Sequence, residues 1–235
     1  MNVVGVTQAL DNTGSSLSSL SVTRSVTAGD LLWLPASAVW AATPKITDTQ
    51  GNFWQLLDLL NYGGHNGAHW WTIASKTGSN QVTMTAANSG TFTYPGMFVT
   101  ELSGVNAVAG HNSTDLSGVQ SGVINGTAIT IAANTLPVLF LSCGQDNSAN
   151  VAPLADTGAG WTSQFIGGNF FGTNSTAIES QQFSTGTSHQ SAWTAGSGNN
   201  GYGFLDAMFY QAAGGAGAGA GMGIGTAKRL TYRSL

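Results

Sequence analysis

Short runs of alternating or β-branched residues recur along the chain at intervals of about 8 to 15 residues. Glycine, asparagine, aspartate and proline separate these runs, of which NVVGVTQAL at 2–10 and GFLDAMFYQA at 203–212 are examples. Such spacing is typical of short strands. Helical spacing is almost absent. NFWQLLDLL at 52–60 also suits a short amphipathic helix, and we interpret it as a strand.

The pattern also matches itself. AGDLLWLPASA aligns with NTLPVLFLSCG at an offset of 107, which sets Leu31 against Val138 and Trp33 against Phe140. Three more pairs of blocks follow in the same order at offsets of 108 or 109: TDTQGNFW with ADTGAGWT, QVTMTA with QSAWTA, and YPGMFVTEL with YGFLDAMFY. Four blocks in one order indicate duplication of a half of five or six strands.

One half alone would leave a sheet face bare, so the two halves are expected to share a core, as the two sheets of a sandwich do. The sequence therefore predicts an all-β fold, a jelly-roll-like β-sandwich of about twelve antiparallel strands over residues 1–212, with halves of about 1–105 and 106–212. Residues 213–235 form a Gly/Ala-rich linker and a basic C-terminal tail.

Charge is scarce and unevenly placed. Charged residues make up 7% of the chain and hydrophobic residues 42%, so the surface is built mostly from hydroxyls and amides around a sizeable core. Residues 1–212 have three basic residues and ten acidic ones, a net charge of −7, and the tail adds three positive charges. Such a body does not attract nucleic acid.

Targeting signals are not apparent. MNVVGVTQALDNTG lacks a basic region and a long apolar core, and no apolar run reaches the length a bilayer requires. We therefore expect synthesis in a host cytoplasm without a signal peptide, no membrane insertion, and release within a particle on lysis.

The lone cysteine, Cys143, lies in the apolar run LPVLFLSC and is expected to be a buried hydrophobic residue.

The order of VTAGDLLWL, ITDTQGNFWQLL, FVTELSGV, TLPVLFL and GFLDAMFYQA resembles a group of duplicated jelly-roll proteins found in bacteriophage virions and in bacterial surface proteins. The resemblance extends over nearly the whole chain up to Ala212. It implies the fold, and it transfers no catalytic residues.

Candidate chemistry is sparse. His65 and His69 are four residues apart in GGHNGAHWW, but the surrounding glycines and asparagine favour a loop, with His111 and His189 far away in sequence. We expect surface or turn histidines, no metal and no cofactor. Nor does the glycine run GAGAGAGMGIG have the spacing of a dinucleotide-binding loop.

Asp48 and Asp156 occupy matching positions before Thr, Gly or Gln. Aspartate in such a place is typical of a turn, where its side chain accepts hydrogen bonds from nearby backbone N–H groups. Calcium binding through TDTQGN is the alternative. No nucleophile elbow is present, so an enzyme is not expected; a glycan hydrolase using Asp48, Glu101, Asp156 or Asp206 is the least favoured hypothesis.

Two surface features could support recognition. Trp70 and Trp71 are adjacent, so a strand would point them to opposite faces, and an outward ring could stack on a sugar together with Tyr62 and His65. The tail provides the second, as the following residues combine positive charge with apolar groups suited to docking on a partner: Lys228, Arg229, Leu230, Tyr232 and Arg233. A disordered solubilising end is the alternative interpretation of the tail.

These observations favour a non-enzymatic virion structural protein of a bacteriophage, a capsid decoration or a tail or fibre component. It would be held by contacts with other copies and other virion proteins, and by its C-terminal tail. The alternative hypothesis is a module that binds carbohydrate or a host receptor, with host-surface glycans as partners.

Overall fold

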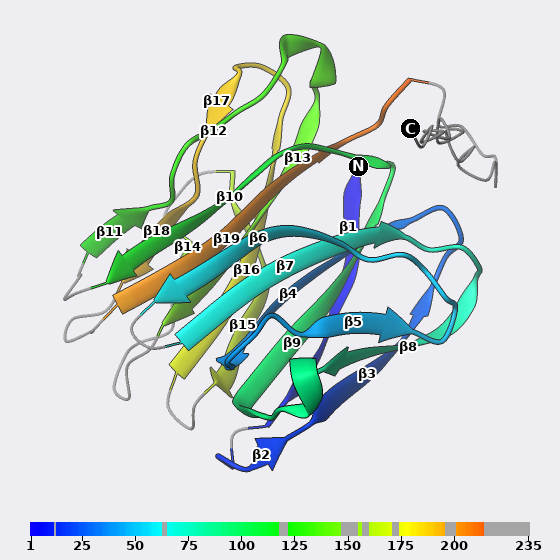
Figure 1. Ribbon diagram of the computed structural model, residues 1–235. Coiled ribbons are helices and arrows are strands. Elements are labelled where there is room, and N and C mark those ends of the chain that lie inside the picture. The colour runs from blue at the N-terminus through cyan, green and yellow to red at the C-terminus, as the bar shows by residue number, and fades with distance from the viewer. Residues whose placement is uncertain are drawn as a thin grey trace, which may run out of the picture.

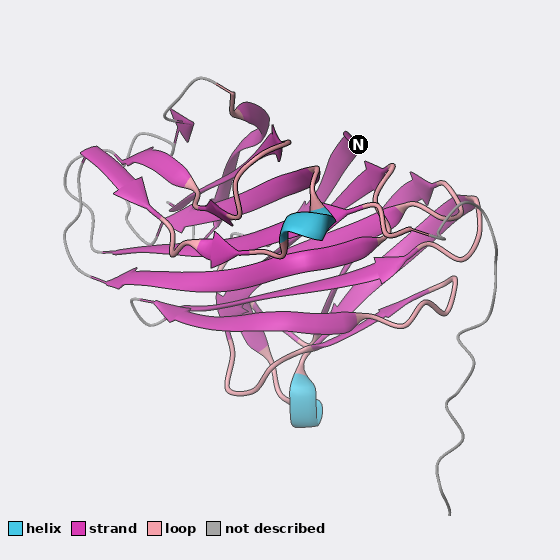
Figure 2. Cartoon of the chain, turned by 90° about the horizontal axis from the view of Figure 1, so that it is seen from above, coloured by secondary structure: helices cyan, strands magenta, loops and turns pink. Residues whose placement is uncertain are grey.

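The computed structural model describes residues 1–11, 13–62, 65–117, 122–146, 155–156, 160–170, 174–195 and 201–213 (Figure 1). Within these residues the chain is all-β: the helical elements are two 3₁₀ turns, η1 (Ala87–Ser89) and η2 (Ala133–Thr135), both outside the sheets (Figure 2). The all-β prediction is confirmed.

The strands of the first half, residues 1–105, are β1 (Asn2–Leu10), β2 (Ser16–Leu17), β3 (Ser19–Val26), β4 (Leu31–Val39), β5 (Lys45–Asp48), β6 (Gln55–Tyr62), β7 (His65–Ile73), β8 (Gly78–Thr85) and β9 (Phe92–Ser103). Those of the second half are β10 (Ala107–Ser117), β11 (Gly122–Asn125), β12 (Ile129–Thr130), β13 (Val138–Asp146), β14 (Ala155–Asp156), β15 (Thr162–Phe170), β16 (Asn174–Phe183), β17 (Ser188–His189), β18 (Ala192–Ala195) and β19 (Gly201–Tyr210).

Each sheet takes its strands from one half. Sheet A has the order β1-β9-β4-β7-β6, with β2 beside β9, and sheet B has the order β3-β8-β5. Sheet C has the order β10-β19-β13-β16-β15, sheet D the order β11-β18-β14, and β12 pairs with β17. The first strand of each half lies at an edge of its larger sheet, next to the last strand of that half. The relative strand order is therefore the same in both halves.

The sheets are stacked, and apolar side chains fill the space between successive layers (Figure 1). Leu34 of sheet A and Met84 of sheet B belong to one cluster, which lies between these sheets. Leu31 and Leu141 belong to a second, between sheets A and C, and two further clusters lie on the other face of sheet C. The two halves therefore share a core between sheets A and C, and each half also has apolar clusters of its own, which the sequence did not predict.

For strands β4 and β13, the sequence alignment of the two halves at an offset of 107 is shifted by one residue from the structural correspondence. Trp33 of β4 packs in the core between sheets A and C, whereas Phe140 of β13, its match at an offset of 107, packs on the other face of sheet C. A shift of one residue moves a strand's side chains to the opposite face, so the matched residues do not have equivalent environments.

The structure has nineteen strands among its described residues, where about twelve were expected. Each of the twelve predicted runs contains a strand, including the 52–60 run, which forms most of β6. The additional strands are β2, β5, β10, β11, β14, β17 and β18. Six of them have two to four residues, too few for a periodic signal. The seventh, β10, has eleven residues and a mostly polar sequence.

Candidate functional site

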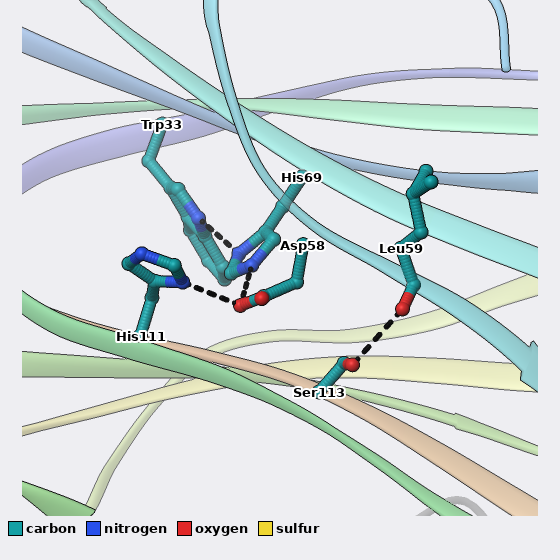
Figure 3. Close-up of polar contacts among 6 residues, drawn as sticks. All are labelled: Trp33, Asp58, Leu59, His69, His111 and Ser113. Carbon is teal, nitrogen blue, oxygen red and sulfur yellow. Dashed lines mark hydrogen bonds and ion pairs between the residues drawn. The ribbon is translucent and has the colours of Figure 1, made fainter.

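Four side chains from both halves meet where sheets A and C face each other: Trp33 of β4, Asp58 of β6, His69 of β7 and His111 of β10 (Figure 3). We call them the polar cluster. Nearby, the Ser113 hydroxyl donates to the Leu59 carbonyl at 3.0 Å. Two polar contacts therefore join β10 of the second half to β6 of the first.

The hydrogen bonds of the polar cluster determine where the protons lie. The indole N–H of Trp33 can only donate, and it lies 3.1 Å from His69 Nδ1, so Nδ1 is the acceptor. The proton of neutral His69 is then on Nε2, which donates to Asp58 Oδ2 at 3.0 Å. His111 Nδ1 lies 2.7 Å from the same oxygen and donates to it. One carboxylate oxygen thus accepts from two imidazoles.

Local strand geometry brings these groups together. The β6-β7 hairpin pairs Asp58 with His69, after a bulge between Leu56 and Asp58. A second bulge, between Val108 and Gly110, precedes His111 in β10. Bulges change the direction of the following side chains. Gly110 also lies close to β12, because a Cβ there would come within 2.6 Å of Ile129 Cγ2.

Burial and hydrogen bonding have opposite effects on the pKa values of His69 and Asp58, which share one hydrogen bond. His69 is fully buried, and the loss of hydration lowers its pKa, against the favourable effect of Asp58. Burial alone would raise the pKa of Asp58, but hydrogen bonds from His69 and His111 outweigh it and hold that pKa below its usual value. The polar cluster therefore consists of a charged carboxylate and a neutral His69.

The metal-ligating atoms of Asp58, His69 and His111 lie within 4.8 Å of one another, close enough to hold one ion. However, a histidine that binds a metal through one nitrogen almost always donates a proton from the other. His69 Nδ1 faces the Trp33 N–H donor, so it has no acceptor for such a proton. Ligation through Nε2 would break this bond or require an imidazolate. The cluster is thus arranged for hydrogen bonding and does not fit a metal.

The structure corrects the expectation for the histidines. His65 and His69 lie on β7, not in a loop, and His69 is fully buried rather than at the surface. His65 is partly buried, and the loss of hydration lowers its pKa. The polar cluster was not predictable from the sequence, because β10, which places His111, has a mostly polar sequence and because Asp58 lies inside a leucine-rich run.

Asp48 has the predicted turn role. Its Oδ1 accepts from the backbone N–H groups of Gln50 and Asn52, at 3.1 and 2.9 Å. Its Oδ2 accepts from the side chains of Asn52, Trp54 and Asn80. Burial works against the charge, but these donors keep the pKa of Asp48 below its usual value. Both oxygens are engaged, which favours the turn over calcium. The backbone of Asp156 is in β14, and its side chain lies outside the described residues.

The other carboxylates named for a hydrolase are buried. Arg24 donates twice to Glu101 Oε2, at 3.1 and 2.8 Å, and the Thr27 N–H donates to Oε1 at 2.8 Å. Asp206 accepts from the Ser191 hydroxyl at 2.8 Å. Burial raises the pKa of Asp206 to about 7, against hydrogen bonds from Ser142 and Ser191. Buried Cys143 is a free thiol with a raised pKa, for the same reason.

The aromatic candidates are divided between two faces, as expected for adjacent strand residues. Trp70 is buried in the core between sheets A and B, and Trp71 is partly buried against the core between sheets A and C. The side chain of Tyr62 and the tail from Lys228 to Arg233 lie outside the described residues. Phe53, which the sequence analysis overlooked, is 82% exposed and lines a hollow of about 280 Å³ with Trp71.

Comparisons with known proteins give no relative: no family model matches the chain, and no curated protein or solved structure shows significant similarity to it. In the part of the chain that the structure describes, no helix has the length and apolar character needed to cross a membrane.

Proposed function

We propose that this chain is a non-enzymatic structural component of a bacteriophage virion, a capsid decoration or a part of a tail or fibre. The observation that supports this function is the use of the polar cluster. Its Asp58, His69 and Trp33 are bonded to one another and to His111 of the other half. The imidazoles and the carboxylate of this cluster are thus engaged in joining the two halves, which suits a rigid building block.

The fold proposed for this block is a duplicated jelly roll. In each half an antiparallel sheet with five strands on its main path faces a smaller sheet of three, with matching strand order, and β2 adds a sixth strand to sheet A. Jelly rolls of two Greek keys occur in viral capsid and lectin domains. This support is an analogy at the level of the fold, because one fold hosts many functions.

The proposed partners are other copies of the chain and other virion proteins. A surface with few charges and many hydroxyl and amide groups suits contacts that are hydrogen-bonded rather than driven by net charge. The C-terminal residues from Lys228 to Arg233 supply a second, basic contact.

Immunogold electron microscopy of lysates from cells that express the gene tests the proposal. Antibodies against the purified chain are expected to label phage-like particles at regular positions, and the chain is expected to sediment with those particles. Labelling confined to the soluble fraction, together with a strictly monomeric mass at all concentrations by light scattering, would contradict it.

Glycan binding is the second candidate, and the exposed ring of Phe53 favours it. Phe53 and Trp71 line one hollow with the amide side chains of Asn52 and Gln55. Aromatic rings beside amides suit a sugar, which has apolar C–H faces and polar edges. A glycan array is expected to show signals that Phe53→Ala and Trp71→Ala abolish, whereas Val123→Ala at another exposed apolar residue preserves them. An array without any signal would exclude this candidate.

A further inference from the structure

The inner face of sheet A extends beyond the sheet that covers it. Sheet B has three strands and the main path of sheet A has five, and β6 lies past the edge of sheet B (Figure 1). Leu56 and Leu59 of β6 pair with Trp70 and Ala68 of β7, which belong to the core between the two sheets. Paired residues share a face, so Leu56 and Leu59 continue that core outward. They are 40% and 51% exposed.

Two consecutive hollows lie along this uncovered face. One, of about 340 Å³, has residues 40–43 on one wall and Leu59, Leu60 and β7 residues on the other. The next, of about 460 Å³, is lined by residues 44–48, the turn up to Trp54, and Trp70. We call the two together the β5-β6 groove. Leu59, which is half exposed, lines the first of them, and an exposed apolar side chain in a groove favours the binding of an apolar segment.

The groove is also bordered by a free strand edge. In the described part of the chain β5 pairs with β8 alone, so its other side has unpaired backbone groups. An extended segment that enters the groove could pair with β5 and place alternate side chains on Leu56 and Leu59. The segment needs an apolar residue at every second position on one face and polar residues on the other.

The C-terminal tail has this pattern. In RLTYR at 229–233, Leu230 and Tyr232 alternate with Arg229, Thr231 and Arg233, so an extended conformation would separate an apolar face from a basic one over these five residues. Two turns of a helix would not separate them in this way, because the alternation has a period of two.

The last described residue of the chain is Ala213. The Ala212 N–H donates to the Asn106 side chain at 2.8 Å. The next residue, Ala107, shares a hollow with Gln55 and Trp71, and these two share another with Phe53 at the end of the groove. Residues 213–227 can extend over about 50 Å.

We propose that residues 229–233 dock in the β5-β6 groove of their own chain as an extended segment beside β5, with Leu230 and Tyr232 on the exposed leucines. The same chain is the source, because a short linker gives an effective concentration in the millimolar range, above that of another copy in dilute solution. In dilute solution this contact takes the place of the tail contact with a neighbouring copy, so the inference goes beyond the proposed function and does not rest on it. In a particle, exchange of tails between neighbouring copies would use the same contact.

Disulfide trapping in the full-length protein tests the placement. Thr47 is exposed on β5, and Thr231 lies on the basic face of the tail. The double variant Thr47→Cys/Thr231→Cys, oxidised with copper phenanthroline and oxygen, is expected to form an intramolecular disulfide, identified by peptide mass. Its matched control is Thr23→Cys/Thr231→Cys, because Thr23 is exposed on β3, the opposite edge strand of sheet B. Cys143 is buried and does not compete.

The outcomes differ clearly. Rapid intramolecular linkage to position 47 and at least tenfold slower linkage to position 23 would support the proposal. Equal rates for both pairs, or linkage that appears only between Thr47→Cys and Thr231→Cys single variants when they are mixed, would overturn it. Linkage between mixed variants would still support the tail contact in the proposed function, so the two proposals can fail separately.

Limited trypsin digestion of the full-length chain provides a second measurement that needs no cysteine. Docking should protect the bonds after Lys228, Arg229 and Arg233. Replacement of Leu230 and Tyr232 by Asp is expected to speed this cleavage about tenfold, because cleavage follows the population of the undocked tail. Leu59→Asp, at the groove itself, is expected to do the same, whereas Val123→Asp on β11 is not. Unchanged rates in all variants would contradict docking.

Discussion

Glu101 of β9 and Asp206 of β19 are the buried carboxyl groups on the last strand of each half, and their partners differ. Both side chains point towards the smaller sheet of their half, and they are 2% and 1% exposed. Glu101 accepts two hydrogen bonds from Arg24 and one from a backbone N–H. Asp206 accepts from the hydroxyl of Ser191. The first half therefore compensates a buried charge with a cation, and the second has no cation at this position among the described residues.

The consequence is a difference in protonation. Burial raises the pKa of Asp206 to about 7, and the nearby charge of Asp58 acts in the same direction. Near neutral pH this carboxyl holds its proton in a large fraction of molecules. The cost of burying a carboxyl group is thus reduced in two ways in similar surroundings. Glu101 has a partner of opposite charge, and Asp206 retains its proton.

Loss of the cation should have the largest effect. Arg24→Met leaves Glu101 buried without its ion-pair partner and is expected to lower the free energy of unfolding by about 3–5 kcal/mol in urea titrations. The double variant Arg24→Met/Glu101→Gln is expected to recover much of this loss, since no unpaired charge remains. Lys76→Met, at an exposed lysine, serves as the control. A single variant as stable as the control would show that the ion pair contributes nothing.

Asp206→Asn should raise the free energy of unfolding, in contrast to Arg24→Met, and the increase should depend on pH. The folded-state pKa of about 7 exceeds the ordinary aspartate pKa of 3.8 in the unfolded chain, so the folded state binds the extra proton. Stability is therefore lost as pH rises from 3.8 to 7, by about 4 kcal/mol in total. The variant has no such loss, and urea titrations should find it more stable than the parent at pH 8 and not at pH 4. A constant difference across this range would contradict the assignment.

The polar cluster accommodates a carboxylate in a third way, by hydrogen bonds from imidazole, with His69 neutral. Its contribution to stability should decrease as the pH falls, whereas that of Asp206 decreases as the pH rises. His69 has a folded-state pKa below 6.5, so below that pH the unfolded chain binds a proton that the folded chain does not. Stability should fall by up to about 2 kcal/mol between pH 6.5 and 5. His69→Gln, which can still accept from Trp33, is expected to flatten this part of the curve. The same slope in both proteins would exclude His69 as its source.

Strand periodicity was sufficient to find the long, half-buried strands, because one face of each packs on a core. It could not reveal β10, whose polar residues and Gly110 reflect an edge position and close contact with Ile129. It also could not give the partners of Glu101, Asp206 or Asp58, since each depends on residues far apart in sequence. Asp48 was predictable because most of its partners lie within six residues.

Zinc addition should have the smallest effect, and it separates the polar cluster from a metal site with the same residue types. An ion bound by Asp58, His69 and His111 would stabilise the folded state in proportion to its concentration above the dissociation constant. Because Trp33 holds His69 in the tautomer with its proton on Nε2, we expect Zn²⁺ to change the melting temperature by less than about 1 °C. Trp33→Phe removes this donor and frees Nδ1 to carry the proton. Zinc stabilisation of the Trp33→Phe variant alone would show that one indole N–H decides between hydrogen bonding and metal binding, whereas stabilisation of the parent protein would contradict the tautomer assignment.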